Sequence, residues 1–258
     1  MPDWVYTSLG IVGLLIVLAY LGLPFVVWQS FKFDVNQLTE IDPDEDFDDL
    51  WADDSSSLSG MRRSLSALGF SEVARCTGAL VSNVDTVFSM MVSPCGNHLA
   101  FVSIVVPKAN TMGAMRYVDF SSEFLDGREI NTQNTSVSPS AQRDPDDSLI
   151  WLPEVQDVPL LWQVHLAHVA RQERGTKSRA IPLDRDPIEF MKDEMSREFT
   201  KKSARGIYKE VEPGVYCLTL KGAFSESWGE LPPFKQLRRR RFHRRSLELL
   251  REVQRRPA

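Results

Sequence analysis

The sequence predicts an α+β fold: a single N-terminal transmembrane helix followed by a soluble domain with a mainly antiparallel sheet and several helices. Residues 4–31 form one long apolar run without formal charge. Short β-rich runs separated by turn residues then cluster between residues 73 and 133, and longer helical patterns follow them. Strands that cluster and then give way to helices are typical of α+β proteins with an antiparallel sheet.

Residues 4–31 predict a membrane anchor, because about 20 apolar residues span the ~30 Å hydrocarbon core as a helix. Trp4 and Tyr6 at one end and Trp28 at the other are expected at the two lipid–water interfaces. Pro24 is tolerated near the end of a membrane helix. A cleavable signal peptide is disfavoured, since the first ten residues carry no Lys or Arg and the apolar core is too long. The chain is therefore expected to be a single-pass membrane protein.

Charge beside the anchor predicts its orientation. Lys32 follows the anchor, whereas no Lys or Arg precedes it, and basic residues favour the cytoplasmic side. The odd, sparse set of Cys76, Cys95 and Cys217 is not a disulfide framework and suits a reducing compartment. The soluble domain is expected in the cytoplasm.

The remaining chain is divided by charge. Residues 34–54 contain ten acidic residues and no basic one, whereas residues 235–256 contain ten basic residues against Glu248 and Glu252. Blocks of like charge with few apolar residues do not order themselves, so the acidic segment is expected to be a flexible tether. The expected organisation is a stub at 1–3, the anchor at 4–31, an acidic tether at 32–57, an α+β domain at 58–230 and a basic amphipathic helix at 231–258.

The clearest local prediction is a hairpin. Val118, Phe120 and Phe124 share one face of a strand, and a three-residue loop at 125–127 brings Ile130 onto the same face. Such a loop is a type I turn with a G1 bulge, whose third position favours glycine, here Gly127. Glu123 is expected on the opposite, solvent-exposed face.

The other elements are predicted from the periodicity of the apolar residues and from the residues that end helices and strands. Strands are expected at 73–81, 85–92 and 99–106, and a loop at 136–148. Helices are expected at 58–68, at 155–172, from Asp186 as N-cap through Lys202, and from Pro232-Pro233 to about Arg255. A second hairpin is expected at 207–220, turning at residues 212–214.

Two pairs of residues are candidates for chemistry. His165 and His168 share a helix face at i, i+3, a spacing a metal can use, but no third ligand completes a known pattern. Two histidines on a helix surface are therefore preferred to a metal site. Cys95 and His98 lie in one turn, where a thiol and an imidazole could meet, although no positioned base is evident. No nucleophile-elbow, phosphate-loop or dinucleotide-binding pattern is present, so no catalytic residue, metal or cofactor is predicted.

The basic C-terminal helix is the strongest functional signal after the anchor. A basic amphipathic helix with aromatic flanks is typical of an interfacial membrane helix or of a site for an anionic partner. The alternative is a terminal helix that docks its apolar stripe on the domain and leaves its arginines in solvent. Nucleic acid is disfavoured in a chain tethered to a bilayer. The residues expected to contact an anionic surface are Arg238, Arg239, Arg240, Arg241, Arg244 and Arg245.

These observations favour a non-enzymatic, single-pass protein whose α+β domain is a binding or interaction module at the membrane surface. Its expected partners are the bilayer, through the anchor, and anionic lipid head groups or an acidic protein, through the basic helix. The alternative is a membrane-tethered enzyme that uses His165 and His168, or Cys95 and His98. A deep pocket lined by those side chains would favour the enzyme.

Overall fold

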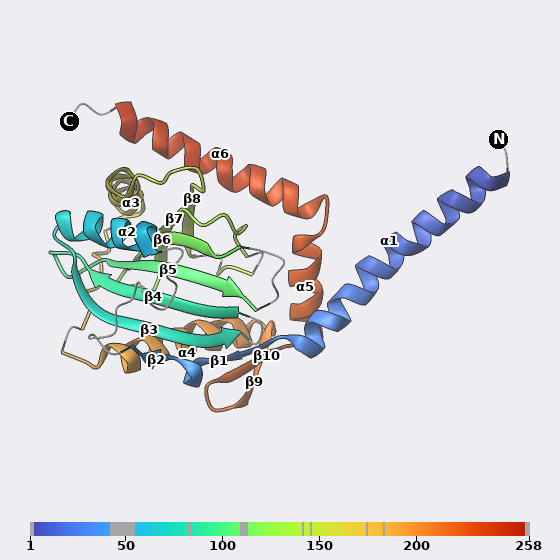
Figure 1. The fold of residues 1–258 in the computed structure, drawn as a ribbon, viewed down its shortest axis with the longest axis horizontal. Coiled ribbons are helices and arrows are strands. Elements are labelled where there is room, and N and C mark those ends of the chain that lie inside the picture. Colours follow the sequence, from blue (N-terminus) through green and yellow to red (C-terminus); the bar gives the residue numbers. More distant parts are fainter. Residues whose placement is uncertain are drawn as a thin grey trace.

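One mixed, mainly antiparallel sheet carries the domain, and a long N-terminal helix projects from it (Figure 1). The structure is a computed structural model that describes residues 3–41, 55–81, 84–108, 113–140, 142–144, 146–173, 175–182 and 184–255. Within these residues the strands are β1 (Lys32–Asp34), β2 (Thr39–Glu40), β3 (Ser71–Val81), β4 (Val84–Val92), β5 (Leu99–Pro107), β6 (Met115–Glu123), β7 (Glu129–Gln133), β8 (Ser148–Trp151), β9 (Tyr208–Glu212) and β10 (Val215–Leu218). The helices are α1 (Asp3–Ser30), the short 3-10 helix η1 (Val35–Gln37), α2 (Ser55–Ala67), α3 (Val158–Gln172), α4 (Pro187–Ala204), α5 (Leu220–Glu230) and α6 (Phe234–Arg255).

The strand order is β8-β7-β6-β5-β4-β3-β1-β10-β9, and β2 pairs with the middle of β3. Strands β3, β4 and β5 confirm the three β-rich runs expected from the sequence. The pair β7–β8 is parallel, and the other pairs are antiparallel. Strand β8 was not expected: the predicted loop ended at residue 148, and no element was predicted for residues 149–151.

The predicted hairpin between β6 and β7 is confirmed. Ser122 pairs with Ile130, and the backbone N–H of Phe124 donates to the Arg128 carbonyl at 2.9 Å. The N–H of Gly127 closes the turn onto the Phe124 carbonyl, and Gly127 has φ +82°, which only glycine adopts without strain. The side chains of Phe124 and Ile130 are completely buried, so the expected apolar face is the core face.

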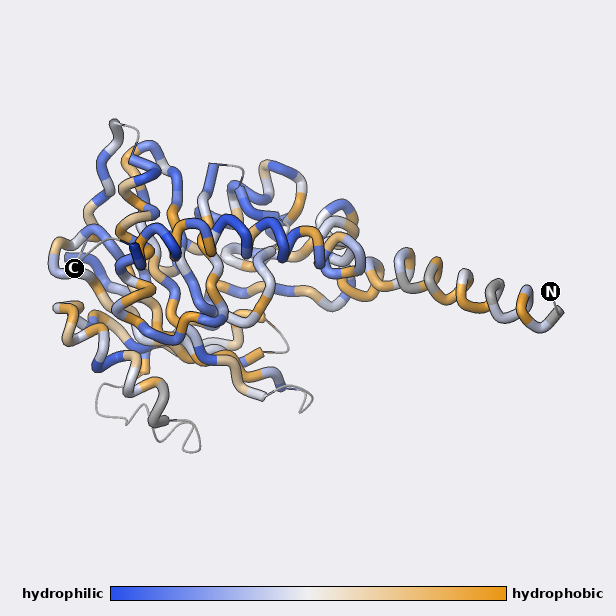
Figure 2. Tube along the Cα trace, turned by 90° about the horizontal axis from the view of Figure 1, so that it is seen from above, coloured by the Kyte–Doolittle hydropathy of each residue, from blue (hydrophilic) through white to orange (hydrophobic). Residues whose placement is uncertain are grey.

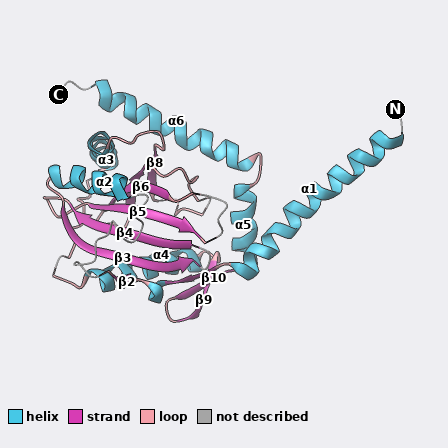
Figure 3. Ribbon diagram, viewed as in Figure 1, coloured by secondary structure: helices cyan, strands magenta, loops and turns pink. Residues whose placement is uncertain are grey.

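Helices cover both faces of the sheet (Figures 1 and 3). Helices α2, α3 and α6 pack on one face, where the largest core cluster joins them to side chains such as Val102, Phe120 and Ile150. Helix α4 packs on the opposite face, over a second cluster that includes Phe88, Met90 and Phe190. The expected N-cap of α4 is confirmed, since the Asp186 carboxylate accepts from the Glu189 N–H at 2.9 Å.

The predicted start of the acidic tether is wrong. Residues 32–41 are part of the sheet: β1 lies between β3 and β10, and the Ile41 side chain is buried. Residues 42–54, which hold most of the acidic side chains, lie outside the described residues. Residues 55–57 belong to α2. Any tether is therefore shorter than the sequence suggested.

Helix α1 is long and apolar enough to cross a membrane. Trp4, Tyr6 and most of its apolar side chains are exposed, and the helix extends away from the domain (Figure 2). Pro24 lies inside the helix, which continues to Ser30. Trp28, expected at a lipid interface, packs instead against the core cluster around Tyr208 and Tyr216. The last turn of α1 therefore belongs to the folded domain.

Helix α5 was not expected from the sequence, and a close backbone approach explains how it fits. Thr219 is its N-cap and accepts from the Gly222 N–H at 3.0 Å. A Cβ atom at Gly222 would lie 2.0 Å from the Ile207 carbonyl oxygen, so glycine is required where α5 meets the start of β9. This contact directs α5 along the C-terminal half of α1 (Figure 1).

Candidate functional site

The two candidate histidines of α3 lie in the core. His165 and His168 are almost completely buried, so the expected surface position is wrong. The His165 imidazole faces β6 and β7 and lies between the rings of Phe120 and Trp162, and the His168 imidazole faces β7 and β8. Within the part of the chain that the structure describes, no three His, Cys, Asp or Glu side chains are grouped to hold a metal ion.

The histidines belong to one chain of side-chain hydrogen bonds. Ser122 Oγ lies 2.5 Å from His98 Nδ1 and 2.8 Å from His165 Nε2. Thr132 Oγ1 joins His165 Nδ1, at 3.1 Å, to His168 Nδ1, at 3.3 Å. The chain ends at Ser148 Oγ, 2.8 Å from His168 Nε2. Three hydroxyls on β6, β7 and β8 thus satisfy three imidazoles.

Arg245 is compatible with one direction of donation along this chain. Its guanidinium can only donate, and it donates to Ser148 Oγ at 3.2 Å, which leaves the Ser148 hydroxyl proton available to His168 Nε2. In this arrangement His168 donates to Thr132, and Thr132 donates to His165. His165 then donates to Ser122, and Ser122 donates to His98, so every imidazole carries one proton and is neutral. Burial lowers the pKa of His98 to about 4 and, with the nearby Arg245 charge, that of His168 to about 3. Burial also lowers the pKa of His165 far below its usual value.

This chain is not an accessible catalytic site. Ser122 and His165 have the spacing of a nucleophile and a base, but the Ser122 hydroxyl is held by two imidazoles and the residue is only 2% exposed. Cys95 is exposed, and its nearest polar partner is Ser93 Oγ at 3.3 Å. The His98 imidazole bonds Ser122 instead, so Cys95 and His98 do not form the thiol–imidazole pair that their shared turn would allow.

A cavity of about 560 Å³ lies on the other face of the sheet, beneath α4. Its volume is in the range of small-molecule sites. The side chains of Cys95, His98, His165 and His168 are not part of its lining. The enzyme alternative therefore has no pocket built from the residues that the sequence nominated.

The register of the sheet divides this cavity into an apolar half and a polar half. Over β3, β4 and β5, and on the facing part of α4, the lining includes Leu80, Phe88, Leu99, Phe101, Phe190 and Met195. Over β6 and β7 the lining is polar. Phe101 pairs directly with Asp119, and Leu99 with Ser121, so the boundary between the two halves runs between β5 and β6. The polar side chains lie on the cavity face of the β6–β7 hairpin, whose opposite face packs in the core. They are Tyr117, Asp119, Ser121, Glu123, Glu129 and Asn131.

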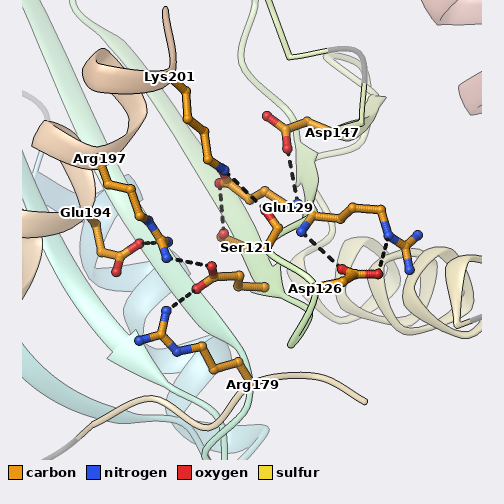
Figure 4. A network of polar contacts seen from close by, with 11 residues as sticks. Ser121, Asp126, Glu129, Asp147, Arg179, Glu194, Arg197 and Lys201 are labelled. Carbon is orange, nitrogen blue, oxygen red and sulfur yellow. Dashed lines mark hydrogen bonds and ion pairs between the residues drawn. The ribbon is translucent and has the colours of Figure 1, made fainter. Parts of the chain in front are cut away.

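Ion pairs connect α4 to the edge of the polar half (Figure 4). Glu123, expected in solvent, accepts from Arg197 at 2.7 Å and from Arg179 at 2.8 Å. Arg197 also pairs with Glu194 on its own helix. Lys201 donates to the Gly127 carbonyl at 3.2 Å. The hairpin face that was expected to be exposed is therefore covered by α4.

The carboxylates of Asp119, Glu129 and Asp147 lie in the inner part of the polar half, and two of them accept hydrogen bonds from the domain. Glu129 accepts from Ser121 and from Asn131, and its N–H donates to Asp147 at 3.1 Å (Figure 4). Burial and the Glu129 charge raise the pKa of Asp147 to about 6. These two carboxylates are held by hydrogen bonds.

Asp119 differs from its neighbours. Its Oδ1 atom is buried and has no hydrogen-bond partner among the described residues. Burial raises the pKa of Asp119 to about 8; Arg143 opposes this, and Glu129 and Glu198 add to it. The Nε atom of Arg143 is also buried without a partner among the described residues. Eight buried side-chain atoms have no partner among the described residues, and only these two belong to residues that line the cavity.

Three of the six arginines predicted to contact an anionic surface make contacts with the domain itself. Arg238 donates to the Gly229 carbonyl at 2.7 Å and pairs with Glu230. Arg239 lies 5.4 Å from the centre of the Trp151 ring, and Arg245 bonds Ser148. Within the described chain, Arg240, Arg241 and Arg244 are exposed and make no ion pair. Leu249, Leu250 and Val253 form the stripe that docks α6 on the core.

The sequence analysis did not identify Asp119 as a candidate residue, because its position between Val118 and Phe120 predicts an ordinary solvent-facing strand residue.

No family model, curated protein or solved structure matches the chain.

Proposed function

We propose that this protein is a single-pass membrane protein whose α+β domain binds the surface of an anionic bilayer through α6. The observation that carries this proposal is the contact of the apolar helix α1 with the end of α5 and with the segment that joins α5 to α6. The Trp228 indole N–H donates to the Tyr20 carbonyl at 2.8 Å, and the Tyr20 hydroxyl donates to the Pro232 carbonyl. If α1 crosses the bilayer, the end of α5 and the start of α6 lie at the level of the head groups.

The side chains exposed at this level suit a lipid interface. Phe234 and Leu237 on the first turn of α6 are 52% and 59% exposed, and the Trp228 ring is also exposed. Arg240, Arg241 and Arg244 follow within two turns. Apolar and aromatic side chains beside unpaired arginines are the composition of a helix that lies in an anionic interface. Figure 1 shows α5 standing between the start of α6 and the C-terminal half of α1.

The charge beside α1 supports a cytoplasmic domain. Lys32 follows α1 in the chain, whereas no Lys or Arg precedes it. Basic residues near the end of a membrane helix favour the cytoplasmic side. The proposal therefore includes the orientation that places residues 32–258 in the cytoplasm.

Vesicle binding tests the proposed role of α6. Fragment 24–258 removes most of the apolar helix, including Tyr20 and its bonds to Trp228 and Pro232, but keeps Val27, Trp28 and Phe31, which pack on the core. Its co-sedimentation with phosphatidylserine-containing vesicles is expected to fall by about 100-fold in the triple variant Arg240→Gln, Arg241→Gln, Arg244→Gln, at about 1 kcal/mol for each basic residue. Binding is also expected to weaken as salt rises.

The matched control removes three exposed basic residues elsewhere, by Lys177→Gln, Arg185→Gln and Lys209→Gln. If both triple variants lose affinity equally, the effect is one of net charge and α6 is not the contact. The effect of the acidic residues at 42–54 on vesicle binding is tested by replacing them in place with Asn and Gln. Deleting them with a fragment that starts at residue 58 is unsuitable, because that fragment lacks β1, which joins β3 to β10.

A further inference from the structure

The cavity beneath α4 is separate from the proposed membrane contact, and its two halves have different chemistry. We propose that it binds a small molecule with an ammonium group at one end and an apolar body, and that the Asp119 carboxylate accepts the ammonium group. The apolar body would lie over β3–β5, against Phe88, Phe101 and Met195.

Hydrogen bonding is the first argument. The Asp119 Oδ1 atom is buried and lacks a donor among the described residues. An unpaired buried acceptor costs the full desolvation of that atom, and a ligand N–H restores the missing bond. A charged donor restores it most strongly, since hydrogen bonds between ions are about twice as strong as neutral ones.

Charge is the second argument. Glu123, Glu194 and Glu198 in the lining already pair with Arg179, Arg197 and Lys202. Besides Asp119 itself, the remaining lining groups are the acids Glu129, Asp144 and Asp147 against Arg143 and Lys201. This excess of carboxylates favours a cation and disfavours a ligand that carries a carboxylate or phosphate.

Shape is the third argument. Asp119 pairs across the sheet with Phe101, so the carboxylate lies at the boundary of the apolar half. A ligand whose amine is joined directly to an apolar chain or ring can therefore fill both halves at once. The volume of about 560 Å³ accommodates such a molecule.

The test uses the full chain in phosphatidylcholine nanodiscs and three probes of equal chain length: hexylamine, hexanol and hexanoate. Binding is measured by ligand-observed NMR, with empty nanodiscs subtracted to remove partition into lipid. Hexylammonium is expected to bind at least about 10-fold more tightly than hexanol, and hexanoate more weakly than either. Asp119→Asn is expected to reduce hexylammonium affinity by between about 10-fold and 100-fold, and to leave hexanol within about threefold.

Two further variants separate the polar and apolar contributions. Asp126→Asn removes an exposed carboxylate of the same hairpin that pairs with Arg128 outside the cavity, and is expected to change none of the affinities. Met195→Gln, in the apolar half, is expected to weaken all three probes. Thermal unfolding of each variant shows whether it is folded.

The pH dependence provides an independent readout. The charged or titratable groups that face Asp119 are Tyr117 on β6, Glu129 on β7, Glu198 on α4 and Arg143 in the following loop. Binding an ammonium ion requires the ionised carboxylate, so hexylammonium affinity is expected to rise between pH 6 and pH 9, and to lose this rise in Asp119→Asn. The proposal is overturned if hexanoate binds as well as hexylammonium, if Asp119→Asn leaves hexylammonium affinity unchanged, or if no probe binds. None of these outcomes affects the vesicle test of α6.

Discussion

Replacing Asp119 by asparagine is expected to stabilise the domain by an amount on the order of 5 kcal/mol at pH 8. In the folded state the pKa of Asp119 is raised to about 8, whereas an aspartate in an unfolded chain titrates near pH 4. Between these values the folded state holds a proton that the unfolded state has released, so stability falls as pH rises. Each unit of pKa shift corresponds to about 1.4 kcal/mol. Asparagine keeps the shape and does not titrate.

Urea unfolding of fragment 24–258 between pH 4 and pH 8.5 measures this effect. The gain from Asp119→Asn is expected to be small at pH 4 and to grow up to about pH 8. Asp147→Asn is the matched control: the pKa of Asp147 is raised only to about 6, so its gain stops growing near pH 6. A destabilised Asp119→Asn variant at pH 8 would show that the carboxylate is ionised and satisfied within the fold. The unpaired acceptor would then be lost as an argument for a ligand.

Truncating Phe124 to alanine is expected to destabilise the domain by about 3–5 kcal/mol, the usual range for a buried phenylalanine. Phe124 is completely buried with Ile130 and Val169, and the Arg128 guanidinium lies 4.9 Å from the centre of its ring. Leu125, the next residue, is 68% exposed, and Leu125→Ala is expected to change stability by under about 0.5 kcal/mol.

Chemical unfolding of the two variants checks the register of the hairpin. Equal losses would contradict it, since a shift of one residue exchanges the two faces. Glu123→Ala is not a neutral control, although its sequence position suggests one. The Glu123 carboxylate pairs with Arg179 and Arg197, and its loss leaves two guanidinium groups unpaired at the edge of the cavity.

Elements determined by neighbouring residues were predictable from the sequence. The turn at Gly127 and the N-cap at Asp186 depend on side chains within four residues of each other, and both are confirmed. Strand β1 was missed because its partners, β3 and β10, are distant in the sequence while its neighbours are acidic. Local composition cannot indicate a strand that is completed only by residues near 216.

The sequence contains a pattern that predicts that His165 and His168 are buried. Leu161, His165 and His168 follow the spacing of one helix face, so the apolar stripe of α3 includes both imidazoles. Ser122 and Thr132 likewise occupy inward positions of their strands. Polar residues at core positions predict a hydrogen-bonded network, and the structure contains one.

The cavity could not have been found in this way. Tyr117, Asp119, Ser121 and Glu123 alternate with core residues, a pattern that predicts a strand with one face in solvent. Only α4, which begins more than 60 residues later, converts that face into a lining. The unpaired Asp119 oxygen is a property of this distant contact.

Cysteine accessibility at two matched leucines tests the membrane proposal most directly. Leu237 on α6 and Leu125 on the β6–β7 turn are similarly exposed in the fold, and each is replaced by cysteine in the full chain carrying Cys95→Ser. With a membrane-impermeant reagent, neither Leu237→Cys nor Leu125→Cys is expected to react in intact cells. In opened membranes Leu125→Cys should react rapidly, and Leu237→Cys slowly until detergent removes the bilayer. Labelling of Leu125→Cys in intact cells, or equal rates at both positions in opened membranes, would contradict a cytoplasmic domain that lies on the bilayer through α6.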